Sequence, residues 1–192
     1  RDERRDRHSG RIWRITAKDK RLTKAPVIAG ASIEELLDLL KRPEYRVRYR
    51  AKLELRERDA QDVLRSLEQW VSQLDPKDAR FRHHQLEALW TYRWIGLATM
   101  ADSVDVAEGT AQSAAEDADG SVDRGTPIQL LRDLLTCDIA HARAAATQQL
   151  RYWHPYLNDA LSLLNKSAND ANAIVRMEAA IAASYIGTRP AF

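Results

Sequence analysis

The sequence predicts an all-α protein built from repeated helix pairs, and three observations support this. Strong helix formers, chiefly Ala, Leu, Arg, Glu and Gln, dominate the 192 residues, whereas Gly (7) and Pro (6) are few. From residue 32 onward, apolar residues recur at the spacing of one helix face. Four segments also align with one another at nearly regular offsets, which is the mark of a repeat architecture.

The first helix pair is predicted at 33–41 and about 44–57. Ser32 with Glu35 three residues later forms a capping box, which starts the first helix, and Pro43 ends it. Part of the second segment alternates as a strand would. The intervening residues are Lys, Glu and Arg, and the segment belongs to the repeat, so we predict a helix. The apolar face of the first helix comprises Ile33, Leu36, Leu37 and Leu40.

Four segments share the pattern of a second helix. Each begins with an apolar residue followed at once by Arg; Ala or Gln comes four positions after the first residue, and Leu or Ala eight positions after it. This spacing places the three positions on one helix face. The offsets are 34 (81 − 47), 61 (142 − 81) and 33 (175 − 142), so a unit of similar length recurs with one insertion. The arginines are Arg48, Arg82, Arg143 and Arg176.

Each later unit also has a predicted first helix, at 60–73, 127–136 and 156–168. Pro127 fits a first helical turn, because its missing N–H is unpaired there anyway. A single helix pair cannot bury its own apolar stripe, whereas stacked pairs form a continuous core. The array therefore predicts one repeat domain over 32–192.

The insertion is predicted at about 99–126, as a mobile acidic loop. Residues 101–126 hold seven Asp or Glu and one Arg, and the insertion has few large apolar residues. Such a composition buries too little apolar surface to offset the entropy of ordering. The insertion accounts for the long middle offset.

Residues 1–31 are predicted to be a basic linker that contains a short strand at 10–16. Residues 1–24 hold ten Arg or Lys and four Asp or Glu, a net charge of +6. The strand is isolated, because no second strand follows to pair with it. The basic residues do not continue as a stripe with interleaved aromatics, so nucleic acid is not an expected partner.

The cysteine count and the lengths of the apolar runs exclude several kinds of protein. Cys137 is the single cysteine, so no internal disulfide forms. No run of about 18 apolar residues occurs, so no membrane insertion is expected, and no signal peptide opens the chain. The first residue is Arg1 rather than Met, so we expect a fragment of a longer protein.

The repeated second helix resembles the HEAT family of armadillo-type repeats. Its pattern is apolar-Arg-x-x-Ala-x-x-x-Leu after a loop with Asp, over about 32–187; Gln85 and Ala142 depart from it. The resemblance implies an α-α superhelix of about four helix pairs that serves as a scaffold and binding surface.

A narrower resemblance is carried by five stretches. They begin Gly10-Arg-Ile-Trp-Arg-Ile-Thr, Ala29-Gly-Ala-Ser-Ile-Glu-Glu-Leu-Leu, Arg48-Tyr-Arg-Ala, Leu55-Arg-Glu-Arg and His83-His-Gln-Leu-Glu-Ala-Leu-Trp. They resemble large bacterial membrane-bound dehydrogenase-like proteins of planctomycetes, in which a β-propeller precedes HEAT-like repeats and a haem-binding cytochrome c segment. The resemblance implies that 10–16 is the last propeller strand, and that the parent protein lies in the periplasm or cell envelope.

No cofactor is expected within these residues. Cytochrome c attachment requires Cys-x-x-Cys-His, whereas Cys137 is followed by Asp138 and stands alone. By the resemblance, haem belongs to a separate domain of the parent. No nucleophile–base motif, phosphate-binding loop or zinc-protease motif occurs either, so no catalytic residue is assigned.

Candidate site residues fall into two groups, a binding set and a ladder. His84 and Glu87 are three apart on one helix and share a face, but two ligands are too few for a metal, and neighbouring His83 diverges by about 100°. Arginines of the repeat are expected to form a structural ladder with Asp78, Asp138 and Asp170. The candidate binding residues are His84, Glu87, Trp90, Trp94, Tyr152 and Trp153, and the ladder arginines are Arg48, Arg82, Arg143 and Arg176.

Three functions remain open from the sequence. The first is a non-catalytic scaffold or protein-interaction module that contacts neighbouring domains of a larger dehydrogenase-like parent or another protein. The second is a stand-alone HEAT protein that binds a peptide or protein. The third is a solenoid enzyme with a metal site near His84 and Glu87. We expect the first, and no enzyme activity in this fragment.

Overall fold

The computed structural model describes residue 15, residue 18 and the ranges 24–107 and 127–186. These residues form eight α-helices and one short 3-10 turn, and no strand. The predicted strand at 10–16 lies outside them, apart from Ile15. The helices are α1 (Ile33–Leu39), α2 (Tyr45–Arg56), α3 (Ala60–Ser72), α4 (Phe81–Ala107), α5 (Pro127–Thr136), α6 (Ala140–Trp153), α7 (Ala160–Ala168) and α8 (Ala173–Tyr185), with the turn η1 (His154–Tyr156) after α6.

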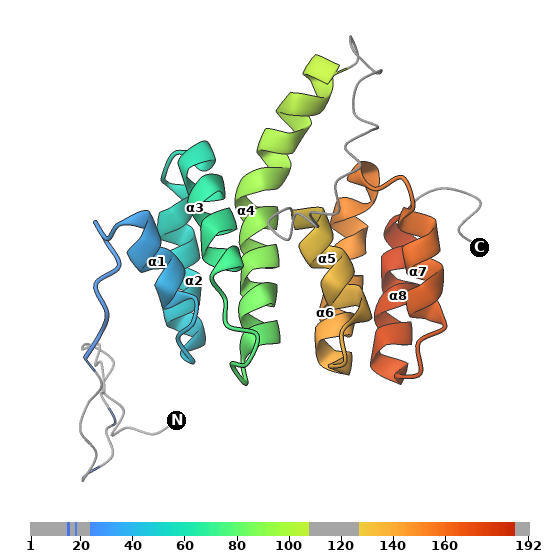
Figure 1. Ribbon diagram of the computed structural model, residues 1–192, viewed down its shortest axis with the longest axis horizontal. Coiled ribbons are helices and arrows are strands. Elements are labelled where there is room, and N and C mark those ends of the chain that lie inside the picture. Colours follow the sequence, from blue (N-terminus) through green and yellow to red (C-terminus); the bar gives the residue numbers. More distant parts are fainter. Residues whose placement is uncertain (1–14, 16–17, 19–23, 108–126, 187–192) are drawn as a thin grey trace, which may run out of the picture.

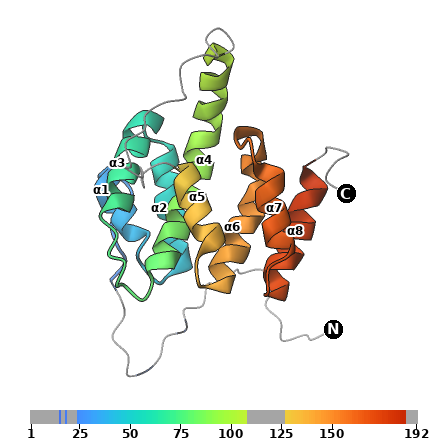
Figure 2. The ribbon, with the colours of Figure 1, turned by 45° about the vertical axis from the view of Figure 1, so that its right-hand side comes forward.

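The helices pack in pairs that follow the order of the chain. α1 packs on α2, α3 on α4, α5 on α6 and α7 on α8. The second helices also contact one another in succession, α2 with α4, α4 with α6 and α6 with α8, so they form one layer. Figures 1 and 2 show the pairs succeeding one another along the molecule from α1 to α8. The prediction of an all-α protein of paired helices is confirmed.

Local capping fixes where several helices begin. The capping box predicted at the start of α1 is present: the Glu35 backbone N–H donates to Ser32 Oγ at 3.2 Å, and the Ser32 N–H donates to the Glu35 carboxylate at 2.9 Å. Asp59 Oδ1 accepts from the Asp62 N–H at 3.0 Å before α3. Side chains thus satisfy backbone donors that a helix start leaves unpaired.

The core lies where the two helices of each pair face one another and where successive pairs meet. Its small residues, such as Ala51 and Ala146, allow close approach of helices, and each is followed four residues later by a fully buried leucine, Leu55 or Leu150. The helical repeat explains this pattern, since positions four apart share a face.

Two boundaries differ from those the sequence predicts. α4 continues through Ala107, so 99–107 is helical rather than part of a loop; these residues contain no Gly or Pro to stop a helix that is already propagating. The rest of the predicted insertion, 108–126, lies outside the described residues. α7 begins at Ala160 rather than 156, because Pro155 lies in the tight turn η1. Among the described helices, none has the length and apolar character needed to cross a membrane.

Candidate interaction surface

Three of the four ladder arginines bind the loop that precedes their own helix in the same way. In Arg48, Arg143 and Arg176, Nη1 donates to the backbone carbonyls six and five residues earlier, at 2.7 to 3.2 Å. A helix–helix loop leaves carbonyl oxygens without partners, and a guanidinium has enough donors to satisfy two of them and still bind a carboxylate. The repeated arginine therefore ties each of these loops to its second helix.

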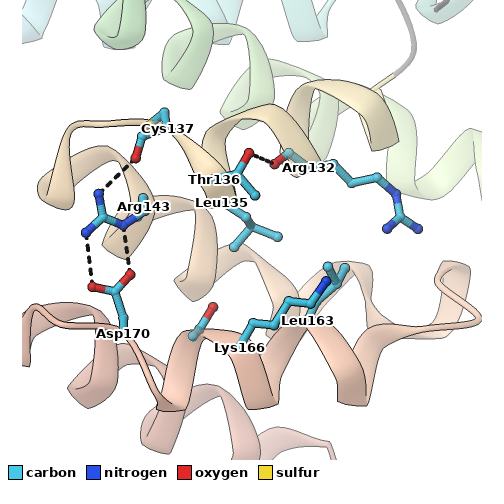
Figure 3. A pocket seen from close by; sticks show the side chains of 9 residues that line it. Arg132, Leu135, Thr136, Cys137, Arg143, Leu163, Lys166 and Asp170 are labelled. Carbon is cyan, nitrogen blue, oxygen red and sulfur yellow. Dashed lines mark hydrogen bonds and ion pairs between the residues drawn. The ribbon is translucent and has the colours of Figure 1, made fainter.

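Arg143 also binds the next helix pair. Its Nε and Nη2 donate to the two carboxylate oxygens of Asp170 at 2.8 and 3.0 Å, as Figure 3 shows. This hydrogen bonding lowers the pKa of Asp170 and raises that of Arg143. Arg132 forms a similar two-bond pair with Asp159, both bonds at 2.7 Å, on a more exposed part of the same boundary. The third and fourth helix pairs are thus joined by two arginine–aspartate pairs.

The first two arginines have different partners. Arg48 binds Glu87 at 2.7 Å rather than Asp78, the aspartate of the following loop. Arg82 donates to Gln85 on its own helix at 2.9 Å and lies 3.8 Å from Asp138. Among the four ladder arginines, and within the described residues, close pairing with a loop aspartate therefore occurs at Arg143 alone, and a helical glutamate takes that role for Arg48.

Glu87 is the centre of a charged cluster between α2 and α4. Its side chain is 2% exposed and accepts from Arg48 at 2.7 Å and from Lys52 Nζ at 2.6 Å, while His83 Nε2 lies 3.5 Å away. Lys52 also lies over the ring of Trp90, 5.3 Å from its centroid. Two mostly buried cations compensate one buried carboxylate, and this pairing offsets the cost of removing the charge from water.

His84 and Glu87 do not form a shared site. His84 is 4% exposed and its Nδ1 lies 3.7 Å from Asp78, whereas Glu87 contacts Arg48 and Lys52. Burial is the largest of the effects that lower the pKa of His84, and of His83. Within the ranges that the structure covers, no three His, Cys, Asp or Glu side chains gather as metal ligands would.

The predicted aromatic residues divide into core and surface. Trp153 is fully buried and belongs to the core. Trp90 and Trp94 are half-buried on α4, and Tyr152 is 36% exposed on α6. The sequence placed these residues near the ends of second helices, but position on the helix decides which of them reaches solvent.

A row of arginine and tyrosine side chains crosses the second-helix layer. Arg93 on α4 lies over the Tyr152 ring at 4.2 Å, Arg151 lies over the same ring at 4.8 Å, and Arg151 also lies over Tyr185 of α8 at 5.4 Å. At the other end, Tyr49 of α2 packs edge-on against Trp94. Sequence reasoning missed most of this row. The signal was present, because Tyr152 and Tyr185 are 33 residues apart (185 − 152), which is the repeat offset.

Large apolar side chains extend the row on α8 and α2. On α8, Met177, Ile181 and Tyr185 are four residues apart and 52%, 38% and 60% exposed; on α2, Tyr49 and Leu53 are 41% and 38% exposed. These positions follow the first residue of the repeat pattern, Val47 on α2 and Val175 on α8, by two, six or ten. At about 100° per residue they point away from the buried face. We call the set Tyr49, Leu53, Arg93, Trp94, Arg151, Tyr152, Met177, Ile181 and Tyr185 the inner surface.

A groove of about 470 Å³ lies between the third and fourth helix pairs (Figure 3). Most of its polar groups are already paired: Thr136 Oγ1 donates to the Arg132 carbonyl at 3.1 Å, and the Ser167 and Thr147 hydroxyls bond at 3.0 Å. Arg132 and Arg143 are held by the aspartates described above. The groove is therefore a joint between two helix pairs.

No family model, no curated protein and no solved structure matches the chain.

Proposed function

We propose that this chain is a non-catalytic protein-interaction module of the HEAT type, in which the inner surface binds a partner. We also propose that the helix pairs form an α-α superhelix. The chain is then one part of a larger membrane-bound dehydrogenase-like protein of the cell envelope. In that setting the partner is a neighbouring domain of the same parent, and haem or other redox chemistry lies outside these residues.

One observation carries the proposal: large apolar and aromatic side chains are exposed at matching positions of α2 and α8, and Tyr152 of α6 matches Tyr185 of α8. A folded surface rarely leaves aromatic residues and methionine exposed in a row, and such side chains supply most of the binding energy at protein interfaces. The row also holds Arg93 and Arg151 against tyrosine rings, a residue pair enriched at binding hot spots.

The charged cluster favours this reading over a catalytic one. Glu87 is 2% exposed and bound by Arg48 and Lys52, so its oxygens are occupied by structural partners. His84 is directed to Asp78 instead. The contacts of Glu87 are accounted for by the joint between α2 and α4, and Nδ1 of His84 faces the loop before α4.

Photo-crosslinking in the full-length protein, as its cell makes it, tests the proposal. A benzoylphenylalanine replaces Met177 or Tyr185 on the inner surface, and the matched control replaces exposed Glu68 on α3. We expect a discrete adduct from the two inner positions, to one partner domain or protein, and none from position 68. Equal labelling from all three positions, or none from any, would contradict an inner binding surface.

A further inference from the structure

Two grooves in the structure occupy equivalent places in successive repeats. The groove between the third and fourth helix pairs is lined by Arg132, Leu135 and Arg143 on its third-pair side. The residues 33 positions later are Asn165, Ala168 and Arg176, and all three line a second groove of about 430 Å³. The fourth pair therefore repeats the wall of the first groove.

Within the part of the chain that the structure describes, the second groove lacks the opposite wall. In the first groove, α7 and the loop after it supply that wall, through Leu163, Lys166, Ser167 and Asp170. The second groove is bounded only by α7 and α8 themselves, through Leu161, Leu164, Asn165, Ala168, Arg176, Ala179, Ala180 and Ala183. Figures 1 and 2 show α7 and α8 as the last pair of the row, with no described helix beyond them.

Equivalent side chains on α6 and α8 differ in burial, as expected when the second groove has no opposite wall. Thr147 and Leu150 of α6 are fully buried, and the Thr147 hydroxyl bonds to Ser167 of the next pair. Their counterparts on α8 are Ala180, which is exposed, and Ala183, which is half-buried. The side chains that are interior in the third pair thus lie at the surface in the fourth. Small residues there leave room for a helix to approach closely.

The arginine ladder is also open at this end. Arg176 makes the two carbonyl contacts typical of the ladder, at 2.8 Å each, but it has no ion-pair partner among the described residues. Its counterpart Arg143 makes the same contacts and in addition binds Asp170 of the next pair. What Arg176 lacks is a carboxylate from the loop of a following unit.

We propose that the end face formed by α7 and α8 docks a further helix pair of the same repeat type, whose inter-helix loop carries a carboxylate that binds Arg176. The inference rests on the proposed function, because the docking pair belongs to the larger parent protein. A repeat array with an uncapped end loses stability, since its terminal interface stays hydrated. The docked pair buries the alanine-lined groove and satisfies the remaining guanidinium donors.

The first helix pair of a second copy of this chain does not fit the end face. Asp170 lies six residues before the ladder arginine of its own unit, and in the first unit that position is Arg42. The first helix pair of another copy would therefore bring a guanidinium toward Arg176. Like charges in a half-buried joint oppose docking, so the occupant is a unit with an acid at this position.

The closing experiment extends the full chain by one repeat. A copy of residues 154–186 is inserted after Ile186, so that each copied residue follows its original by 33 positions and the copied Asp170 faces Arg176. We expect urea unfolding to shift to a higher midpoint without loss of cooperativity. A double-mutant cycle between Arg176→Gln and the copied Asp170→Asn should show a coupling of about tenfold in the unfolding equilibrium constant.

The fourth pair itself provides the matched control. In the existing joint Asp159 binds Arg132, but the counterpart of Arg132 on the end face is Asn165. The copied Asp159→Asn should therefore show no coupling to Asn165→Ala. Equal coupling at both positions, or no coupling at Arg176, overturns the assigned carboxylate contact, and an unchanged midpoint overturns docking of a repeat.

Two further results distinguish failure of the docking proposal from failure of the proposed function. If the unextended chain dimerises in sedimentation experiments and Ala180→Arg abolishes the dimer, a second copy covers the face and the proposal is wrong. The inner surface is untouched by these variants. Loss of the crosslinks from Met177 and Tyr185 would therefore contradict the proposed function alone, and failure of the extension would contradict this inference alone.

Discussion

Arg143 and Asp170 join the third and fourth helix pairs through two hydrogen bonds of 2.8 and 3.0 Å between side chains that are only 17% and 14% exposed. The backbone carbonyl of Asp170 at the same time accepts from Arg176 at 2.8 Å. One residue thus connects α6, the loop between α7 and α8, and α8. A two-bond guanidinium–carboxylate pair fixes orientation as well as distance, so it determines how one helix pair is set on the next.

Replacement of Asp170 by Asn should destabilise the fold more than the same change at Asp159. We expect Asp170→Asn to lower the free energy of unfolding by about 1–3 kcal/mol, because Arg143 loses its charged partner at a mostly buried site. The Arg132–Asp159 pair is 37% and 40% exposed, so Asp159→Asn should cost no more than about 1 kcal/mol. Urea denaturation of both variants measures this. Equal losses would mean that burial does not distinguish the two pairs.

The Arg143–Asp170 pair also predicts how stability depends on pH in acid. Hydrogen bonds from Arg143 lower the pKa of the Asp170 carboxyl in the folded state, whereas the unfolded chain keeps a value near about 3.9. A depressed folded pKa stabilises the protein above the unfolded pKa, and this stabilisation is lost as pH falls through the folded value. The free energy of unfolding should therefore decrease more steeply below about pH 4 in the native chain than in Asp170→Asn. If the free energy of unfolding fell equally steeply with pH in the native chain and in Asp170→Asn, the Arg143–Asp170 pair would not be the source of this pH dependence.

Glu87 should be the most costly acidic residue to neutralise. Glu87→Gln leaves Arg48 and Lys52, which are 11% and 13% exposed, without a carboxylate, and we expect a loss of about 3 kcal/mol or more. Glu54→Gln is the matched control, because Glu54 pairs with Arg58 where both side chains are about one-third exposed. Thermal unfolding of the two variants compares them. If Glu87→Gln unfolds no earlier than Glu54→Gln, the cluster does not hold α2 to α4.

The sequence predicted the helix pairs well, for a physical reason. Each pair must bury an apolar stripe, so the spacing of Ala51 and Leu55, or of Ala146 and Leu150, is visible in the sequence. Pro43 and the Ser32–Glu35 capping box marked boundaries, because their effects act within one helical turn. Local chemistry and periodicity were therefore enough for the fold class and for most helix ends.

Partners across the joints were predictable only in part. Asp170 was expected to bind a ladder arginine and does so, because Arg143 reaches the loop between α7 and α8 of the next unit. The partner of Arg48 was missed, since Glu87 lies within a helix, while the loop aspartate Asp78 lies 3.7 Å from His84 Nδ1. Which residues of the inner surface reach solvent depends on the rotation of one helix against another, and periodicity alone does not give that angle.

His84 should make the protein less stable as pH falls toward 5. Burial lowers its pKa in the folded state more than the nearby Asp78 carboxylate raises it, and its buried Nε2 has no hydrogen-bond partner among the residues that the structure describes. The unfolded chain has a histidine pKa near about 6.5, so it binds a proton that the folded state resists. Stability should therefore rise with pH between the folded pKa and about 6.5, and be lost as pH falls through that window.

Replacement of His84 by Leu tests this dependence. Leucine is similar in size and has no polar atom to desolvate, so we expect little loss of stability at pH 8 and a flatter profile between about pH 5 and 7. His141→Gln on the exposed side of α6 is the control and should leave the slope as in the native chain. His83, whose pKa is also lowered, should retain part of the slope in the His84 variant. If the stability of His84→Leu depended on pH as steeply as that of the native chain, protonation of the buried His84 imidazole would not be the cause of the loss of stability.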